Sequence, residues 1–179
     1  MEKLIEITDK EIGMPVQEVL YWKVRDAARA IVFDFDKKKI GLLHITKQNY
    51  HTVSGGGVEQ GESILEALNR EILEELGCKI KVTKKLTTIL EYRSHSLLKQ
   101  RSHCFIADLL EKKEFNPTQE EIDSGAVIVW MPLEEAIKTM KKELIFAKEN
   151  NNTIDEYERL FMLTRNIIIL EMAKEELKK

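Results

Sequence analysis

Hydrophobic residues along the chain follow two patterns, and these patterns separate predicted strands from predicted helices. The strand-like segments are short runs rich in β-branched and aromatic residues, bounded by polar turns. They occupy residues 28–35, 40–46, 50–53, 79–93, 101–110 and 126–131. A polar turn at residues 36–39 predicts that the first two strands pair as a hairpin, and the glycines at residues 55–57 are expected to break the strand pattern. Residues 111–125 are expected to form a charged loop.

Two helices are predicted in the last third of the chain. The first follows Pro132 and keeps its apolar residues at a strict 4-3-4-3 spacing, which places them on one helical face. The second begins at a capping box formed by Thr153 and Glu156 and runs to about Leu177. This helix carries two neighbouring apolar stripes, formed by Leu160, Leu163, Ile167 and Leu170 and by Tyr157, Phe161, Ile168 and Met172. A surface that wide needs cover on more than one side.

The order of the predicted elements indicates an α/β fold in which helices cover a mixed sheet, although periodicity does not determine the topology. We expect one domain in residues 1–150. Residues 151–179 would then add a C-terminal helix that packs either on this domain or on the partner in a homodimer. More than half of the helix circumference is apolar, so we expect part of it to stay exposed in a monomer and to favour the homodimer.

Composition and charge exclude several classes of function. The formal net charge is −3, with acids and bases mixed along the chain, which argues against a nucleic acid polymer or a membrane surface as partner. No segment approaches the roughly 20 apolar residues of a membrane span, and residues 1–23 lack the apolar core of a signal peptide. Cys78 and Cys104 show no CxxC spacing and are expected to be reduced, buried thiols. These features predict a cytoplasmic protein.

The clearest helix, residues 63–76, carries the candidate chemistry. Ser63 and Glu66 form its capping box, and Gly77 supplies its stop signal. Three glutamates follow at i, i+3 and i+4, so they project from one side of the helix: Glu71, Glu74 and Glu75. Like charges at this spacing repel one another. A solvated face and a salt bridge to Arg70 are possible explanations, but one arginine cannot neutralise three carboxylates, whereas Mg²⁺ favours clustered carboxylate oxygens.

The surrounding spacing resembles the Nudix box. Gly56, five residues, Glu62, seven residues, Arg70-Glu71-Ile72-x-Glu74-Glu75-x-Gly77 meets every charged and glycine position of that motif. Cys78 stands at the closing aliphatic position, and Ser54 precedes the glycines in place of the proline that many members have there. The resemblance extends over roughly residues 25–147. It implies a Nudix-like mixed sheet between helices and hydrolysis of a nucleoside diphosphate linked to another group.

The resemblance also implies roles for individual residues. Glu71, Glu74 and Glu75 would bind Mg²⁺, for which Mn²⁺ can substitute, helped by the backbone carbonyl of Gly56. Arg70 would orient Glu71, and Glu62 would stabilise the junction between loop and helix or join the outer metal shell. The general base stays open between Glu74 on the helix and two acids before the last strand, Glu120 and Glu121.

The choice among the substrate classes of the family is narrowed by elimination. ADP-ribose hydrolases of the family carry a proline after the box, and no proline occurs here between Cys78 and Pro117. Dinucleoside polyphosphate hydrolases carry a tyrosine beyond the box, and Tyr92 matches that position only approximately. A nucleoside triphosphate, including one with an oxidised base, is therefore favoured. The alternative is a nucleotide-sensing module without catalysis, which loss of box glutamates would favour.

Several other side chains are weaker candidates for contacts with the substrate. Arg29 on the first strand can reach a phosphate or a base, or point to solvent. Four aromatic residues have base stacking or core packing as alternatives: Tyr50, Tyr92, Phe105 and Trp130. The four histidines are explained as polar strand positions.

Overall fold

The computed structural model describes residues 4–115 and 117–178. Its strands are β1 (Leu4–Thr8), β2 (Lys23–Phe33), β3 (Ile40–Ile45), β4 (Tyr50–Thr52), β5 (Gly55–Gly57), β6 (Cys78–Arg93), β7 (Leu98–Lys112) and β8 (Ala126–Met131). Its helices are α1 (Asp9–Ile12), α2 (Ile64–Leu76), α3 (Gln119–Ser124), α4 (Leu133–Glu149) and α5 (Ile154–Glu176), with a 3₁₀ turn, η1 (Ser94–Ser96). Each strand and helix expected from periodicity is present, with its ends shifted by a few residues.

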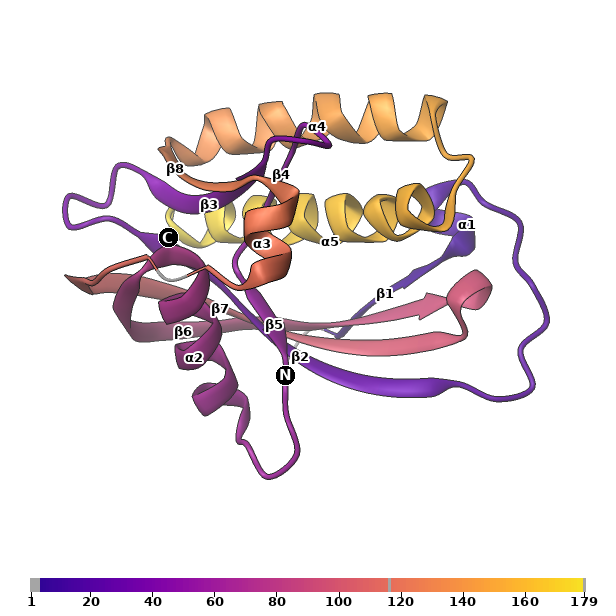
Figure 1. Cartoon of the computed structure of the whole chain (residues 1–179), viewed down its shortest axis with the longest axis horizontal. Helices are drawn as coiled ribbons and strands as arrows, with labels where there is room; N and C mark the ends of the chain where they lie inside the picture. Colours follow the sequence, from indigo (N-terminus) through magenta and orange to yellow (C-terminus); the bar gives the residue numbers. More distant parts are fainter. Residues whose placement is uncertain (1–3, 116, 179) are drawn as a thin grey trace.

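The strands form one mixed sheet in the order β1-β6-β7-β2-β3-β4, and β5 and β8 pair with β2 and β3 outside this path. β2 runs parallel to β7 and antiparallel to β3, as the predicted hairpin requires. α2 covers one face of the sheet, and α4 and α5 lie side by side over the other (Figure 1). The expected α/β architecture, a mixed sheet between helices, is therefore confirmed.

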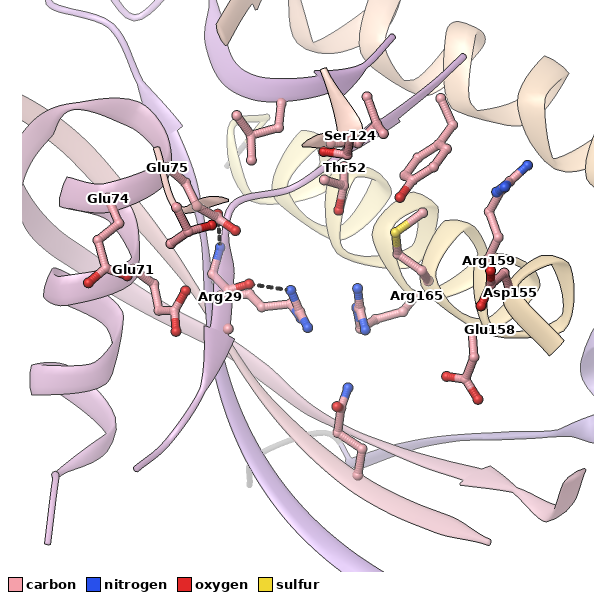
Figure 2. Close-up of a pocket in the computed structure, with 18 of the residues that line it drawn as sticks. Arg29, Thr52, Glu71, Glu74, Glu75, Ser124, Asp155, Glu158, Arg159 and Arg165 are labelled. Carbon is pink, nitrogen blue, oxygen red and sulfur yellow. Dashed lines mark hydrogen bonds between the residues drawn. The ribbon is translucent and has the colours of Figure 1, made fainter. Parts of the chain in front are cut away.

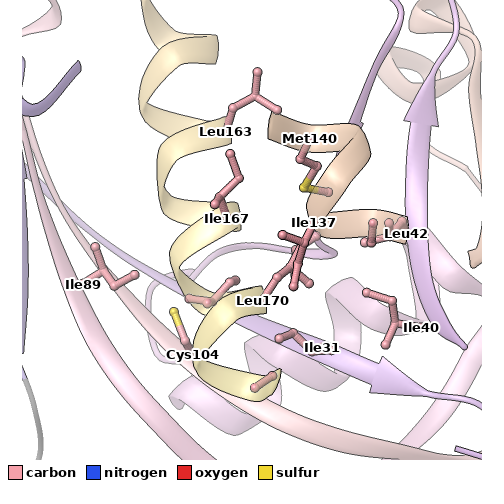
Figure 3. Close-up of a cluster of buried hydrophobic side chains, with 14 of the residues drawn as sticks. Ile31, Ile40, Leu42, Ile89, Cys104, Ile137, Met140, Leu163, Ile167 and Leu170 are labelled. Carbon is pink, nitrogen blue, oxygen red and sulfur yellow. The ribbon is translucent and has the colours of Figure 1, made fainter. Parts of the chain in front are cut away.

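The alternation of β2 divides the hydrophobic core into two clusters. Ile31 and Phe33 belong to the cluster with α4 and α5, which Figure 3 shows, whereas Ala30 and Val32 belong to the cluster under α2. Successive side chains of a strand point to opposite faces, so one strand supplies both layers. Cys78 and Cys104 are buried, unpaired thiols, as expected.

Two local expectations are wrong, and one strand was not anticipated. Residues 55–57 do not interrupt the sheet but form β5, because an extended glycine backbone can pair with residues 27–29 of β2. The segment 111–125 is not a continuous loop: β7 extends to Lys112, and α3 occupies six of its residues. Near the N-terminus, β1 pairs in parallel with β6, and the side chain of Thr8 then caps α1. This strand lies outside the segments that periodicity indicated.

α5 is enclosed by its own chain. All its residues from 156 to 174 are buried or half-buried, and the residues of both apolar stripes except Met172 belong to or pack against the core cluster with α4 and the sheet. The expectation that one apolar face of this helix packs on the domain while the remaining apolar surface stays exposed in a monomer is therefore wrong, since the sheet and α4 cover it from two sides. Among the helices that the structure describes, none has the length and apolar character needed to cross a membrane.

Packing of α5 within the chain predicts that a charge on its inner side destabilises the fold. Ile168 packs against the core, whereas Ile154, the first residue of the helix, is 53% exposed. Ile168→Asp should lower the free energy of unfolding by roughly 2 kcal/mol or more, and Ile154→Asp should change it little. Urea unfolding combined with light scattering tests this. A wild-type dimer that Ile168→Asp converts to a monomer of unchanged stability would contradict intramolecular packing.

Candidate functional site

α2 holds the three box glutamates at the edge of a large cavity. The Ser63–Glu66 capping box is present, and Gly77 ends the helix in the left-handed conformation. The inner face of α2 packs on the sheet through Ala67, Leu68, Ile72 and Leu76. Because that face is anchored, Glu71, Glu74 and Glu75 are directed toward the cavity they line.

Arg70 links the glycine loop to the helix. Its Nε and Nη2 atoms donate to the two carboxylate oxygens of Glu62 at 2.9 and 3.1 Å, and Nη2 also donates to the carbonyl of Gly57 at 3.0 Å. Nη1 donates to Glu71 at 2.7 Å and to Glu74 at 3.3 Å. The hydrogen bond from Arg70 is the main cause of a lowered pKa at Glu62. One guanidinium group therefore connects the loop with two of the three cavity glutamates.

Glu71 is packed closely against the backbone of β5. Burial raises the pKa of its carboxyl, with Arg70 opposing the rise and Glu74 adding to it. A Cβ atom at Gly56 would lie 2.4 Å from the carboxylate carbon of Glu71 and from both of its oxygens. Only glycine permits this approach of the β5 backbone to the carboxylate.

Gly55 connects the box to the other half of the cavity. Its N–H donates to Oε2 of Glu75 at 2.7 Å, and its carbonyl accepts from Nη1 of Arg29 at 2.6 Å (Figure 2). Its φ of +131° favours glycine, and a Cβ there would lie 2.1 Å from the carbonyl oxygen of Ala28. The β5 backbone thus passes between a carboxylate on α2 and a guanidinium group on β2.

The donor set suits a hard divalent cation, since all three candidate side chains offer carboxylate oxygens. Glu71 and Glu74 nevertheless share Arg70 as a partner, and Glu75 accepts from the N–H of Gly55. Within residues 4–115 and 117–178, no three carboxylate, imidazole or thiol groups converge on a single metal position. Three acids crowd around Arg70, namely Glu62, Glu71 and Glu74, and Glu71 is partly desolvated. This concentration of negative charge fits the binding of a cation.

The cavity has a volume of about 1060 Å³, at the upper end for small-molecule sites. Besides α2 and β5, it is lined by side chains of β3, β4, α3 and α5. Tyr50, weighed as a stacking residue, lines it, and the guanidinium group of Arg159 lies 4.9 Å from the centre of its ring. Phe105 and Trp130 instead belong to the α2 core cluster, and Tyr92 packs against Trp22.

A buried charge network forms the inner wall of the cavity. Glu91 is fully buried and accepts hydrogen bonds from Arg93 and Gln100 at 2.7 Å, from Ser102 at 3.1 Å and from Arg165 at 3.3 Å. Burial opposes ionisation of Glu91, but the attraction of Arg165, Arg93 and Arg29 outweighs it and lowers the pKa to about 2. The inner wall therefore carries several positively charged arginines around the single carboxylate of Glu91.

Sequence reasoning missed the contribution of α5 to this cavity. Its lining residues are Asp155, Glu158, Arg159, Met162 and Arg165. The available signal was Arg165, which with Thr164 and Asn166 interrupts an otherwise apolar run. Glu120 and Glu121 lie on the α3 backbone, but their side chains are outside the described residues. None of the four histidines lines the cavity.

Comparison with known proteins agrees with this site. The NUDIX domain family matches residues 23–154, about three quarters of the chain. The chain belongs to the Nudix family. It is thereby a Nudix hydrolase, a class that acts on phosphoric anhydride bonds. No curated protein sequence is a significant match.

Several solved structures share its fold. The E. coli ORF135 protein is 25% identical, with a TM-score of 0.50, and the match covers 66% of this chain and 80% of that one. A NUDIX hydrolase from Nitrosomonas europaea is 19% identical, with a TM-score of 0.54 and coverages of 66% and 79%. An ADP compounds hydrolase is 23% identical, with a TM-score of 0.52 and coverages of 86% and 73%.

The buried network predicts a pH-dependent contribution to stability. Glu91→Gln should lower the free energy of unfolding by on the order of 3–5 kcal/mol, because the arginines lose their shared carboxylate. The folded-state pKa is lowered, so this contribution is complete above the unfolded-state pKa of about 4.3 and is lost as the pH falls toward about 2. Urea unfolding at decreasing pH should show the difference from wild type shrinking across that window.

The matched control is Glu18→Gln, at an exposed position, which should stay close to wild type at every pH. A destabilisation by Glu91→Gln that does not change with pH would contradict ionisation of Glu91 in the folded state.

Proposed function

We propose that this Nudix hydrolase is a magnesium-dependent pyrophosphohydrolase that cleaves a nucleoside diphosphate linked to another moiety. The observation that carries the proposal is the placement of all three box carboxylates on one cavity large enough for a nucleotide. Magnesium commonly joins one or two protein carboxylates to substrate phosphates.

The chain supplies a defined role for each box residue in this proposal. Glu71, Glu74 and Glu75 hold the ion together with the carbonyl of Gly56, and Mn²⁺ can replace Mg²⁺. When bound, the ion neutralises developing charge on the pyrophosphate oxygens. Arg70 orients Glu71 and, through Glu62 and Gly57, keeps the loop against the helix. Glu74, Glu120 and Glu121 are the candidates for the general base.

A nucleoside triphosphate, including one with an oxidised base, is the favoured substrate. This preference rests on the absence of a proline between Cys78 and Pro117 and on the inexact position of Tyr92. Tyr50 and Met162 offer apolar surface to a base within the cavity. The alternative, a sensor that binds nucleotides without cleaving them, is disfavoured because no box glutamate is missing. Release of phosphate or pyrophosphate across a nucleotide panel separates these possibilities.

Domain organisation, location and assembly complete the proposal. We assign residues 1–150 to the Nudix domain and residues 151–179 to a C-terminal helix packed on it. Two buried, unpaired cysteines suit the reducing cytoplasm. A homodimer has less support than the sequence suggested, because α5 is already covered within the chain. The light scattering described for Ile168→Asp tests it.

The metal assignment predicts a selective loss of activity. Turnover should disappear in chelator and return with Mg²⁺ or Mn²⁺. Glu75→Gln removes a charge but little volume, so it should lower kcat/KM by at least about 100-fold while the protein stays folded. The matched control is Glu66→Gln on the same helix, where glutamine can keep the capping hydrogen bond. Full turnover by Glu75→Gln at saturating Mg²⁺ would defeat the assignment.

The two acids on α3, Glu120 and Glu121, give a separate prediction about the base. If Glu120 or Glu121 accepts the proton, its conversion to glutamine should lower kcat by about 10²–10⁴-fold with little loss of Mg²⁺ affinity. Glu114→Gln, an exposed acid before the same helix, serves as the control. Unchanged rates in both single variants and in the double variant would return the role to Glu74.

A further inference from the structure

α5 enters the cavity although it lies beyond the segment that the Nudix family matches. That match ends at residue 154, where α5 begins. The helix nevertheless contributes five lining residues, among them Arg165. The cavity is therefore completed by a helix that the family match does not include.

Arg165 faces Arg29 across this cavity. Figure 2 shows the two guanidinium groups directed toward one another, between the glutamates of α2 and the acidic start of α5. Arg29 lies on β2, at the same face of the strand as Ile31 and Phe33, and this pleat directs it toward α5. The guanidinium groups of Arg29 and Arg165 thus approach each other from opposite walls of the cavity.

The charges of this pair are not fully compensated by the protein. Arg93 has a carboxylate on each side, Glu91 and Glu158, whereas Arg165 shares Glu91 at 3.3–3.4 Å and otherwise donates to the amide oxygen of Asn166. Arg29 donates to the carbonyl of Gly55. Within the described part of the chain, Arg29 has no carboxylate within 4.0 Å, and its buried Nε atom has no hydrogen-bond partner.

If Arg29 and Arg165 had only a structural role, burying them in this way would lower the stability of the fold. Burial and the repulsion of Arg165 lower the pKa of Arg29 to about 9, although Glu91 and Glu75 counteract the shift. A buried cation without a full set of acceptors is expensive, and apolar side chains of similar volume would fill the space at lower cost. Both arginines line the cavity, so a ligand can supply the missing acceptors.

We propose that Arg29 and Arg165 form a subsite for a phosphate group of the substrate, so that α5 completes the substrate site. This inference rests on the proposed function, since it assumes that the cavity receives a phosphorylated ligand. Two planar guanidinium forks match the oxygens of one phosphate group bidentately. The subsite lies beside the metal box but uses none of its carboxylates. It can therefore be tested without metal.

The test measures binding of inorganic pyrophosphate to the full chain in chelator, by isothermal titration calorimetry. Wild-type protein should bind it, and Arg29→Gln and Arg165→Lys should each weaken binding by about 10- to 100-fold, the loss expected for charge-assisted hydrogen bonds. Arg165→Lys keeps a positive charge next to Glu91, which protects the fold while removing the fork. Arg29→Gln tests the opposite wall if the α5 variant proves unstable.

Arg101→Lys is the control. Arg101 pairs with Asp26 at 2.7 and 2.9 Å and is not among the residues that line the cavity. This variant should change pyrophosphate affinity by no more than about twofold. Equal losses in all three variants would show that the effect is not specific to Arg29 and Arg165 and would overturn the subsite. Unchanged binding in a folded Arg165→Lys variant would overturn the role of α5.

The remaining outcomes separate this inference from the proposed function. Wild-type protein that hydrolyses nucleotides with Mg²⁺ but does not bind pyrophosphate in chelator would overturn the subsite and leave the hydrolase standing. Protein that binds pyrophosphate through Arg29 and Arg165 but hydrolyses no nucleotide with Mg²⁺ or Mn²⁺ would support the subsite and overturn the proposed function.

Discussion

The pleat of β2 is the constraint on which both walls of the cavity depend. Ala30 and Val32 carry the layer under α2, while Arg29, Ile31 and Phe33 face α4 and α5. The same strand pairs with β5, whose glycines bring the backbone against Glu71 and Glu75. A shift of one residue in the register of β2 would exchange these faces and separate the carboxylates from the arginines.

Opposite charges are concentrated at two ends of one cavity. Around α2, a single guanidinium group, Arg70, serves Glu62, Glu71 and Glu74. On the inner wall, the buried carboxylate of Glu91 lies between Arg93 and Arg165, and Arg29 adds a further positive charge. Excess negative charge near the box and excess positive charge opposite it are complementary to a complex of a cation with a phosphorylated ligand. The polarity of the cavity thus agrees with the hydrolase class.

α5 combines two tasks that normally conflict. Its apolar stripes close the core against α4 and the sheet, and Arg165 and Asn166 are buried within the same helix. Buried polar groups are tolerated where each finds partners, and here Glu91 and Thr52 provide them. Stability and the shape of the cavity are therefore coupled through one helix, so changes on its inner face should affect both.

The sequence by itself determined the features that depend on neighbours along the chain. The capping boxes at Ser63 and Thr153, the stop at Gly77 and the i, i+3, i+4 spacing of the glutamates follow from local helix geometry and are present in the structure. The Nudix box indicated the family for the same reason, since its residues lie within one loop and one helix. Helix and strand periods likewise indicated the α/β class.

Only the tertiary structure decided which distant segments meet. Residues 55–57 became a strand because β2 offers a pairing edge, and residues 4–8 became one because β6 does. The burial of α5 and the approach of Arg165 to Arg29 depend on α4 and the sheet enclosing a helix more than 100 residues away from β2 along the chain. Periodicity shows that a face is apolar, but not what covers it, because contacts between distant segments are formed only in the folded chain.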